Sequence, residues 1–149
     1  MKSIKLIIFE VNNQKYAADV MEVERILGYS KTTKIPDCPD FVDGVINYEG
    51  NILPVISLAK KFKLKDDNVG EDSRIIVAKE EDKKIGIIVD VVDEIEEVDE
   101  STIEKPDSAV SDISKRYIKG LIKKEKDIII FLNLFNVLTD EQKQQLEEK

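Results

Sequence analysis

The chain has 149 residues, of which 42% are hydrophobic and 36% are charged, with a net charge of −8 and no histidine. The length favours one domain, or two small lobes that share a core. The acidic balance disfavours binding to nucleic acid or anionic membranes, and the lack of histidine removes the commonest general base. No apolar run approaches the ~20 residues of a membrane-spanning helix, and the N-terminus does not fit a signal peptide. With one cysteine, Cys38, and therefore no internal disulfide, we expect a cytoplasmic protein.

Four β-hairpins are predicted along the chain, each from two apolar runs joined by a short polar turn. The paired runs are 5–11 with 15–19, 45–48 with 51–58, 73–80 with 84–92, and 117–124 with 128–134. A weaker strand is expected over 31–35. Several runs are continuously apolar, which indicates strands covered on both faces. The pattern predicts an all-β barrel architecture in place of a parallel βαβ fold.

Three short helices are expected between and after these strands. Asp19 is a suitable N-cap for a helix over 19–27, and Gly28 follows as a left-handed terminator. A second helical turn is predicted over 58–62. A C-terminal helix is predicted over 139–149, where Thr139 and Gln142 form a capping box.

The segment 19–27 carries an apolar stripe formed by Val20, Val23 and Leu27, joined by Ile26. Their spacing of three to four residues fits one face of a helix. The stripe either faces the core or forms a partly exposed patch that contacts another protein. The sequence leaves both interpretations open.

The hairpin over 44–58 contains a proline within its second strand. Proline cannot donate to a strand ladder, so Pro54 is expected at an edge, a bulge or a barrel corner. Gly50 is expected to supply the positive φ of a three-residue turn, Glu49-Gly50-Asn51. This hairpin is therefore expected to bend over a barrel corner.

Charged runs offer two further candidates. The acidic run 90–104 is expected to be a solvated face, with a metal site as the alternative. Basic residues around the predicted hairpin at 117–134 form either an anion patch or a solvated hairpin that faces the acidic run, and we favour the second; they are Lys115, Arg116, Lys119, Lys123 and Lys124. No catalytic motif is present, so no catalytic residue, metal or cofactor is predicted.

Three segments, YAADVMEVERILGY, PDFVDGVINYEGNILPVISL and KIGIIVDVVDEI, resemble the CheW-like domain family of chemotaxis coupling proteins. The resemblance covers nearly the whole chain. It implies an all-β (mainly β) fold of two five-stranded SH3-like barrels packed together, with short helices and a C-terminal helix. The first barrel is expected from about Asn12 to about Val69. The second is expected over about 70–138 together with the N-terminal strand 1–11.

The same resemblance implies an adaptor without catalysis that links chemoreceptor tips to the regulatory domain of the chemotaxis histidine kinase. Receptor tips are expected in an apolar groove lined by Val20, Val23, Ile26 and Val92. No small-molecule substrate, cofactor, nucleic acid or direct membrane insertion is expected, and the protein would reach receptor arrays through its partners. The alternative, an oligonucleotide-binding barrel, is disfavoured by the acidic balance and by the lack of an aromatic stacking platform.

Two charges depart from the family pattern. Glu49 stands where the family usually has arginine, and Arg25 stands where it often has glutamate. Because both signs are reversed, we predict that the two side chains form an ion pair between the hairpin tip and the end of the 19–27 helix. The pair is expected to orient the interface more than to stabilise the fold.

Overall fold

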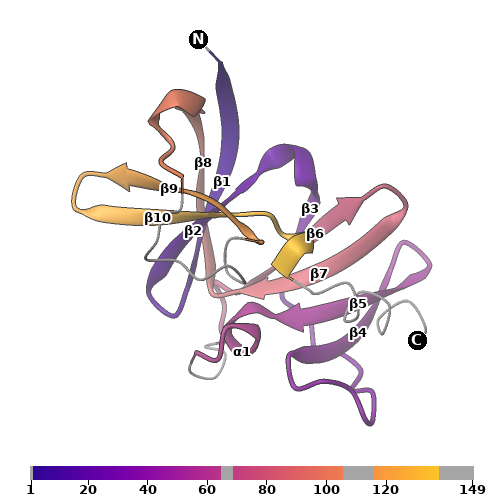
Figure 1. Cartoon of the computed structure of the whole chain (residues 1–149). Coiled ribbons are helices and arrows are strands. Elements are labelled where there is room, and N and C mark those ends of the chain that lie inside the picture. Colours follow the sequence, from indigo (N-terminus) through magenta and orange to yellow (C-terminus); the bar gives the residue numbers. More distant parts are fainter. Residues whose placement is uncertain (1, 65–68, 106–115, 138–149) are drawn as a thin grey trace.

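The computed structural model describes residues 2–64, 69–105 and 116–137. The described chain is mainly β and forms two five-stranded sheets (Figure 1), which confirms the predicted fold class. The four predicted hairpins are all present. The predicted C-terminal helix over 139–149 lies outside the described residues.

The first sheet, sheet A, has the strand order β8-β1-β2-β10-β9. All its neighbours are antiparallel except β2 and β10, which are parallel. Its strands are β1 (Ser3–Val11), β2 (Gln14–Asp19), β8 (Val91–Asp99), β9 (Ile118–Lys124) and β10 (Asp127–Leu132).

The second sheet, sheet B, has the order β3-β6-β7-β5-β4, with β5 and β7 parallel. Its strands are β3 (Val23–Gly28), β4 (Val42–Tyr48), β5 (Asn51–Ser57), β6 (Arg74–Glu80) and β7 (Lys83–Val89). The boundaries of the two sheets differ from the boundaries expected for the two barrels. Strand β2 belongs to sheet A, and strands β6 and β7 belong to sheet B.

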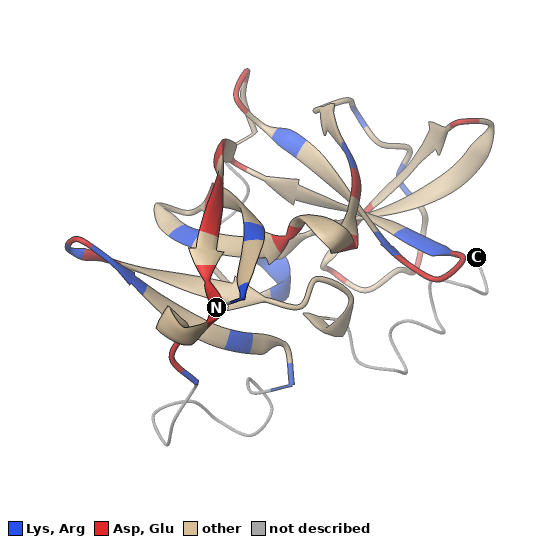
Figure 2. Ribbon diagram, turned by 90° about the horizontal axis from the view of Figure 1, so that it is seen from above, with Lys and Arg blue, Asp and Glu red and all other residues tan. Residues whose placement is uncertain are grey.

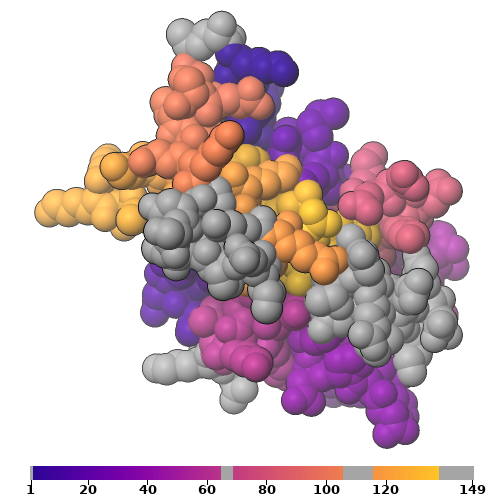
Figure 3. Space-filling model, viewed as in Figure 1, coloured from indigo at the N-terminus to yellow at the C-terminus, as the bar shows by residue number. Residues whose placement is uncertain are grey.

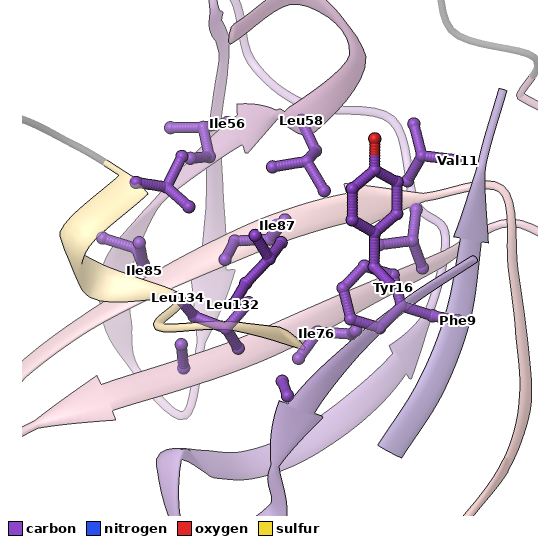
Figure 4. Close-up of a cluster of buried hydrophobic side chains, with 14 of the residues drawn as sticks. Phe9, Val11, Tyr16, Ile56, Leu58, Ile76, Ile85, Ile87, Leu132 and Leu134 are labelled. Atoms are coloured by element: carbon purple, nitrogen blue, oxygen red, sulfur yellow. The ribbon is translucent and has the colours of Figure 1, made fainter. Parts of the chain in front are cut away.

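Three layers of apolar packing explain the continuously apolar strands. A large core lies between the two sheets, and Figure 4 shows Phe9 and Tyr16 of sheet A beside Ile76 and Ile87 of sheet B. The opposite face of sheet A covers a smaller cluster around Phe131. The opposite face of sheet B covers two clusters around Leu53, Val55 and neighbouring strands. The strands are therefore buried on both faces, as their sequences predict.

In each sheet, an isolated β-bridge connects the two edge strands. In sheet B, Thr33 lies after edge strand β3 and forms a bridge with Val45 of the other edge strand, β4. In sheet A, Glu104 lies after edge strand β8 and forms a bridge with Leu121 of the other edge strand, β9. A glycine precedes each bridged residue on the edge strand. A Cβ atom on Gly44 would lie 2.4 Å from the Thr33 carbonyl oxygen, and one on Gly120 would lie 2.4 Å from Ile103 Cγ2. Both positions therefore require glycine.

The two halves of the chain repeat the same arrangement. FVDGVINYEGNILPVISL (41–58) forms hairpin β4–β5, and YIKGLIKKEKDIIIFLNL (117–134) forms hairpin β9–β10. The hairpins β1–β2 and β6–β7 correspond in the same way. In each half the strand after the first hairpin joins the other sheet, so that β3 enters sheet B and β8 enters sheet A. Each half therefore contributes strands to both sheets.

The predicted helix over 19–27 is wrong. Asp19 does act as an N-cap, accepting from the Met21 amide, but it caps only the single 3-10 turn η1 (Val20–Glu22). The chain then continues as strand β3, which pairs with β6. Pairing with a neighbouring strand here overrides the local helical spacing. Gly28 closes this strand and is not among the residues with positive φ.

Smaller features also differ from the sequence predictions. The segment 31–35 forms only the Thr33 bridge. The turn of hairpin β4–β5 has two residues, Glu49 and Gly50, with φ values of 52° and 82°. Positive φ at both positions matches the two-residue turns favoured in hairpins. The predicted helical turn over 58–62 is confirmed as α1 (Leu58–Lys61).

The pairing of β4 explains why Pro54 is tolerated. Pro54 lies opposite Val45, whose amide and carbonyl both bond to Thr33 on the far side of β4. The two residues are therefore a pair without mutual hydrogen bonds, and β4 requires no N–H from residue 54. The parallel ladder between β5 and β7 begins one residue later, at Val55.

Within the described residues, no helix is long and apolar enough to cross a membrane.

Gly44→Ala should destabilise the fold by about 2–3 kcal/mol, because the new methyl group meets a backbone oxygen and the φ of 151° is rare for L-residues. Gly28→Ala is the matched control, since no atom lies within 4 Å of the added carbon, and its effect should stay within about 1 kcal/mol. Urea unfolding of both variants measures the difference. Equal stability of the two variants would contradict the assignment of the bridge as a close backbone contact.

Candidate functional site

A β-bulge places Val23 and Ile26 on one face of strand β3. Val23 lies opposite Ala78 and Ile26 lies opposite Ile76, with a register shift between Val23 and Arg25. Residues directly opposite in a ladder share a face, and Ile76 and Ala78 both point into the core between the sheets. The three-residue spacing that resembles a helix is thus produced by a bulge in a strand.

Strand β8 repeats this arrangement in sheet A. Val92 lies opposite Phe9 and Ile95 lies opposite Ile7, again with a register shift between them. Phe9 and Ile7 belong to the same shared core. Ile95 was not predicted from the sequence, although VDEI (92–95) repeats the pattern of VERI (23–26) and would have indicated it.

The 3-10 turn η1 positions Val20 beside these strands. The Asp19 carboxylate accepts from the Met21 amide at 2.9 Å, which caps the turn. The Glu22 carboxylate accepts from the Leu134 amide at 3.0 Å and from Lys119 Nζ at 2.9 Å. The turn is thereby tied to the strands of sheet A.

The residues Val20, Val23, Ile26, Val92 and Ile95 are called here the β3/β8 surface. Val20, Val23 and Val92 are partly buried and pack against the shared core. Ile26 and Ile95 remain 36% and 61% exposed, and Met21 of the neighbouring turn is 80% exposed. The inner members of the stripe therefore pack against the core and its outer members face solvent, while its contact with another protein stays a prediction.

The predicted ion pair between Arg25 and Glu49 is present, with Arg25 Nη2 3.3 Å from Glu49 Oε2. Arg25 lies within strand β3 and not at the end of a helix as expected. Both side chains are about half exposed, and the guanidinium also lies over the ring of Tyr48. The contact joins β3 to the tip of hairpin β4–β5, and its orienting role stays a prediction.

Tyr48 is the centre of a small polar network at this place. Its hydroxyl donates to Glu24 Oε2 at 2.6 Å, and Lys84 Nζ lies 3.0 Å from the other oxygen of Glu24. The hydrogen bond to this carboxylate raises the pKa of Tyr48 to about 12. The same bond, followed by Lys84, lowers the pKa of Glu24.

The acidic strand β8 and the basic hairpin β9–β10 face each other, as predicted. Lys124 pairs with Glu94 and Glu96, and Lys123 lies 3.4 Å from Glu104. Lys and Arg are scattered over both sheets in Figure 2, and the tip of the β9–β10 hairpin projects from the body in Figure 3. Lys119 is paired with Glu22, and Lys115 lies outside the described residues. Because Lys119, Lys123 and Lys124 are all paired with acids, the described part of this hairpin gives no support to an anion patch or an oligonucleotide platform.

The geometry of the site is suited to noncovalent docking. Its outer members are aliphatic and exposed, and its flanks are charged and paired. Across 2–64, 69–105 and 116–137, no three metal-ligating side chains gather in a way that could hold an ion. What the arrangement offers a partner is apolar area with a charged border.

Comparisons with known proteins agree with this architecture. The CheW-like domain family model matches residues 5–142. The chain is 32% identical to a chemotaxis protein CheW of Bacillus subtilis, covering 94% of the chain and 90% of that protein, and 33% identical to one of Thermotoga maritima, covering 94% and 91%. The crystal structure of the scaffolding protein TtCheW from Thermoanaerobacter tengcongensis superposes with a TM-score of 0.84 at 33% identity, over 94% of this chain and 91% of that one.

Proposed function

Because the chain belongs to the CheW-like domain family and is a chemotaxis adaptor, we propose that it couples transmembrane chemoreceptors to the chemotaxis histidine kinase by binding alone. The receptor partner is the cytoplasmic tip of a chemoreceptor. The kinase partner is its regulatory domain. The protein would act in the cytoplasm, at receptor arrays that it joins through these two partners, and would catalyse no reaction.

The observation that carries the receptor site is the β3/β8 surface. Two corresponding strands, β3 and β8, each carry a bulge that turns a valine and an isoleucine toward the same side. Exposed aliphatic side chains beside a completed core are typical of a protein contact. We therefore assign receptor docking to Val20, Val23, Ile26 and Val92, and add Ile95.

Replacing Ile26 with Asp should lower the affinity for a receptor cytoplasmic fragment at least tenfold, because docking would bury an unpaired carboxylate. Ile26 is 36% exposed, so the folded state should lose only about 1 kcal/mol. Ile52→Asp is the matched control, since Ile52 is 72% exposed in the same sheet and lies outside the surface. Binding is measured by calorimetry with the receptor fragment and, separately, with the kinase regulatory domain.

Kinase binding of the Ile26 variant should stay at the wild-type level. Equal loss of receptor affinity in the Ile26 and Ile52 variants would refute the assignment of the surface. Global unfolding of the Ile26 variant would show that the residue belongs to the core.

Charge reversal tests the Arg25–Glu49 pair. Glu49→Arg places two guanidinium groups together and should reduce receptor-dependent kinase activation, whereas adding Arg25→Glu should restore it. Each single change should shift the free energy of unfolding by only about 0–1 kcal/mol, because the pair is half exposed. The readout is kinase autophosphorylation in reconstituted receptor complexes. Failure of the double reversal to restore activation would show that the pair does not orient the interface.

A further inference from the structure

Glu24 and Arg25 are consecutive in strand β3, yet both side chains contact Tyr48. Glu24 accepts a 2.6 Å hydrogen bond from the Tyr48 hydroxyl, and the Arg25 guanidinium lies 5.8 Å from the ring centroid. In a regular strand, consecutive side chains point to opposite faces. The common contact with Tyr48 therefore depends on the bulge at this point.

The same bulge decides which side chains reach the β3/β8 surface. In a regular strand that kept Ile26 opposite Ile76, Glu24 would turn toward the shared core and Val23 would turn away from it. With the bulge, Val23 and Ile26 both face that core, and Glu24 turns toward Tyr48. Whatever stabilises Glu24 on the Tyr48 side thus also stabilises the position of Val23.

We propose that Tyr48 and Lys84 are positioning residues that hold the bulge of β3 through Glu24 and so place Val23 and Ile26 for partner docking. Tyr48 is well placed for this role because its ring is almost fully buried at the end of β4. Lys84 belongs to β7 and adds an ion pair of 3.0 Å to Glu24. The network connects three strands of sheet B at one point. The docking part of the inference rests on the proposed function.

The second half of the molecule has a related contact. By the repeat of the two hairpins, Lys124 at the end of β9 corresponds to Tyr48 at the end of β4. By the repeat of VERI and VDEI, Glu94 of β8 corresponds to Arg25 of β3. Lys124 Nζ lies 3.2 Å from Glu94 Oε1. In both halves, the last residue of the edge strand contacts the bulged strand. Tyr48 contacts β3 through a hydrogen bond and a cation–π contact, and Lys124 contacts β8 through an ion pair.

The test uses the full chain with Tyr48→Phe, which removes only the hydroxyl, and Glu24→Ala, which removes the acceptor. Both should lower affinity for a purified chemoreceptor cytoplasmic fragment about tenfold, the effect of losing one hydrogen bond to a charged group, with kinase regulatory domain binding unchanged. Glu24→Gln keeps an acceptor oxygen and should retain most of the affinity. Glu80→Gln, an exposed carboxylate on the neighbouring strand β6, is the control and should behave as wild type.

Two measurements without a partner separate this inference from the proposed function. Cross-strand nuclear Overhauser effects between Val23 and Ala78 report the register directly, and they should weaken in Tyr48→Phe and Glu24→Ala. Phenolate absorbance should show a lower pKa for Tyr48 in Glu24→Ala than in the wild type, where the hydrogen bond to Glu24 is the main cause that raises the pKa to about 12. If the wild type binds no receptor fragment, the proposed function fails, and the register measurement still decides the positioning role.

Three results would overturn the inference. The first is wild-type register in both variants. The second is wild-type receptor affinity in Tyr48→Phe. The third is a parallel loss of receptor and kinase binding that follows thermal stability alone, since that would give Tyr48 only a general structural role.

Discussion

The apolar core between the two sheets is the constraint on which the rest of the structure depends. It lies between the facing sides of the two sheets, while smaller clusters cover their opposite sides, so central strands such as β1, β6 and β7 must be apolar on both faces. Val20, Val23 and Val92 are among the partly buried side chains that pack against this core, and the exposed Ile26 and Ile95 lie on the same faces of their strands. Folding and docking thus use one continuous apolar region, and the inner members of the surface serve both.

Much of the fold could be predicted because its hairpins are local. Each is marked by two apolar runs and a turn, and all four occur where the sequence places them. The helix predicted over 19–27 is wrong for a definite reason, since apolar residues three positions apart fit a helix and a bulged strand equally well. Only the register with β6, some fifty residues later, decides between them. The sequence does not show which sheet each strand joins for a similar reason, because strands exchanged between sheets leave no local signal.

The site shows the same division between local and long-range information. Two opposite departures from a family pattern were sufficient to predict that Arg25 and Glu49 meet. They did not indicate Tyr48 or Lys84, whose contacts with Glu24 require knowing that β3, β4 and β7 converge. Ile95 lay within an acidic run whose charges suggested a solvated face. Several of those acids are exposed or paired with lysines, but Val92 of the same strand packs against the shared core and Ile95 lies on the same side.

The exchange of strands has a consequence for how the chain is made. Sheet B is complete once residue 89 has left the ribosome, because all its strands lie between Val23 and Val89. Sheet A is not, since its first hairpin, β1–β2, awaits β8 on one side and β10 on the other. One face of the nascent hairpin can pack on sheet B, but its β1 edge stays open until β8 has emerged, and its β2 edge stays open until β10, the last strand, has emerged. Those edges are the place where a chaperone would be needed, or where two growing chains would associate wrongly.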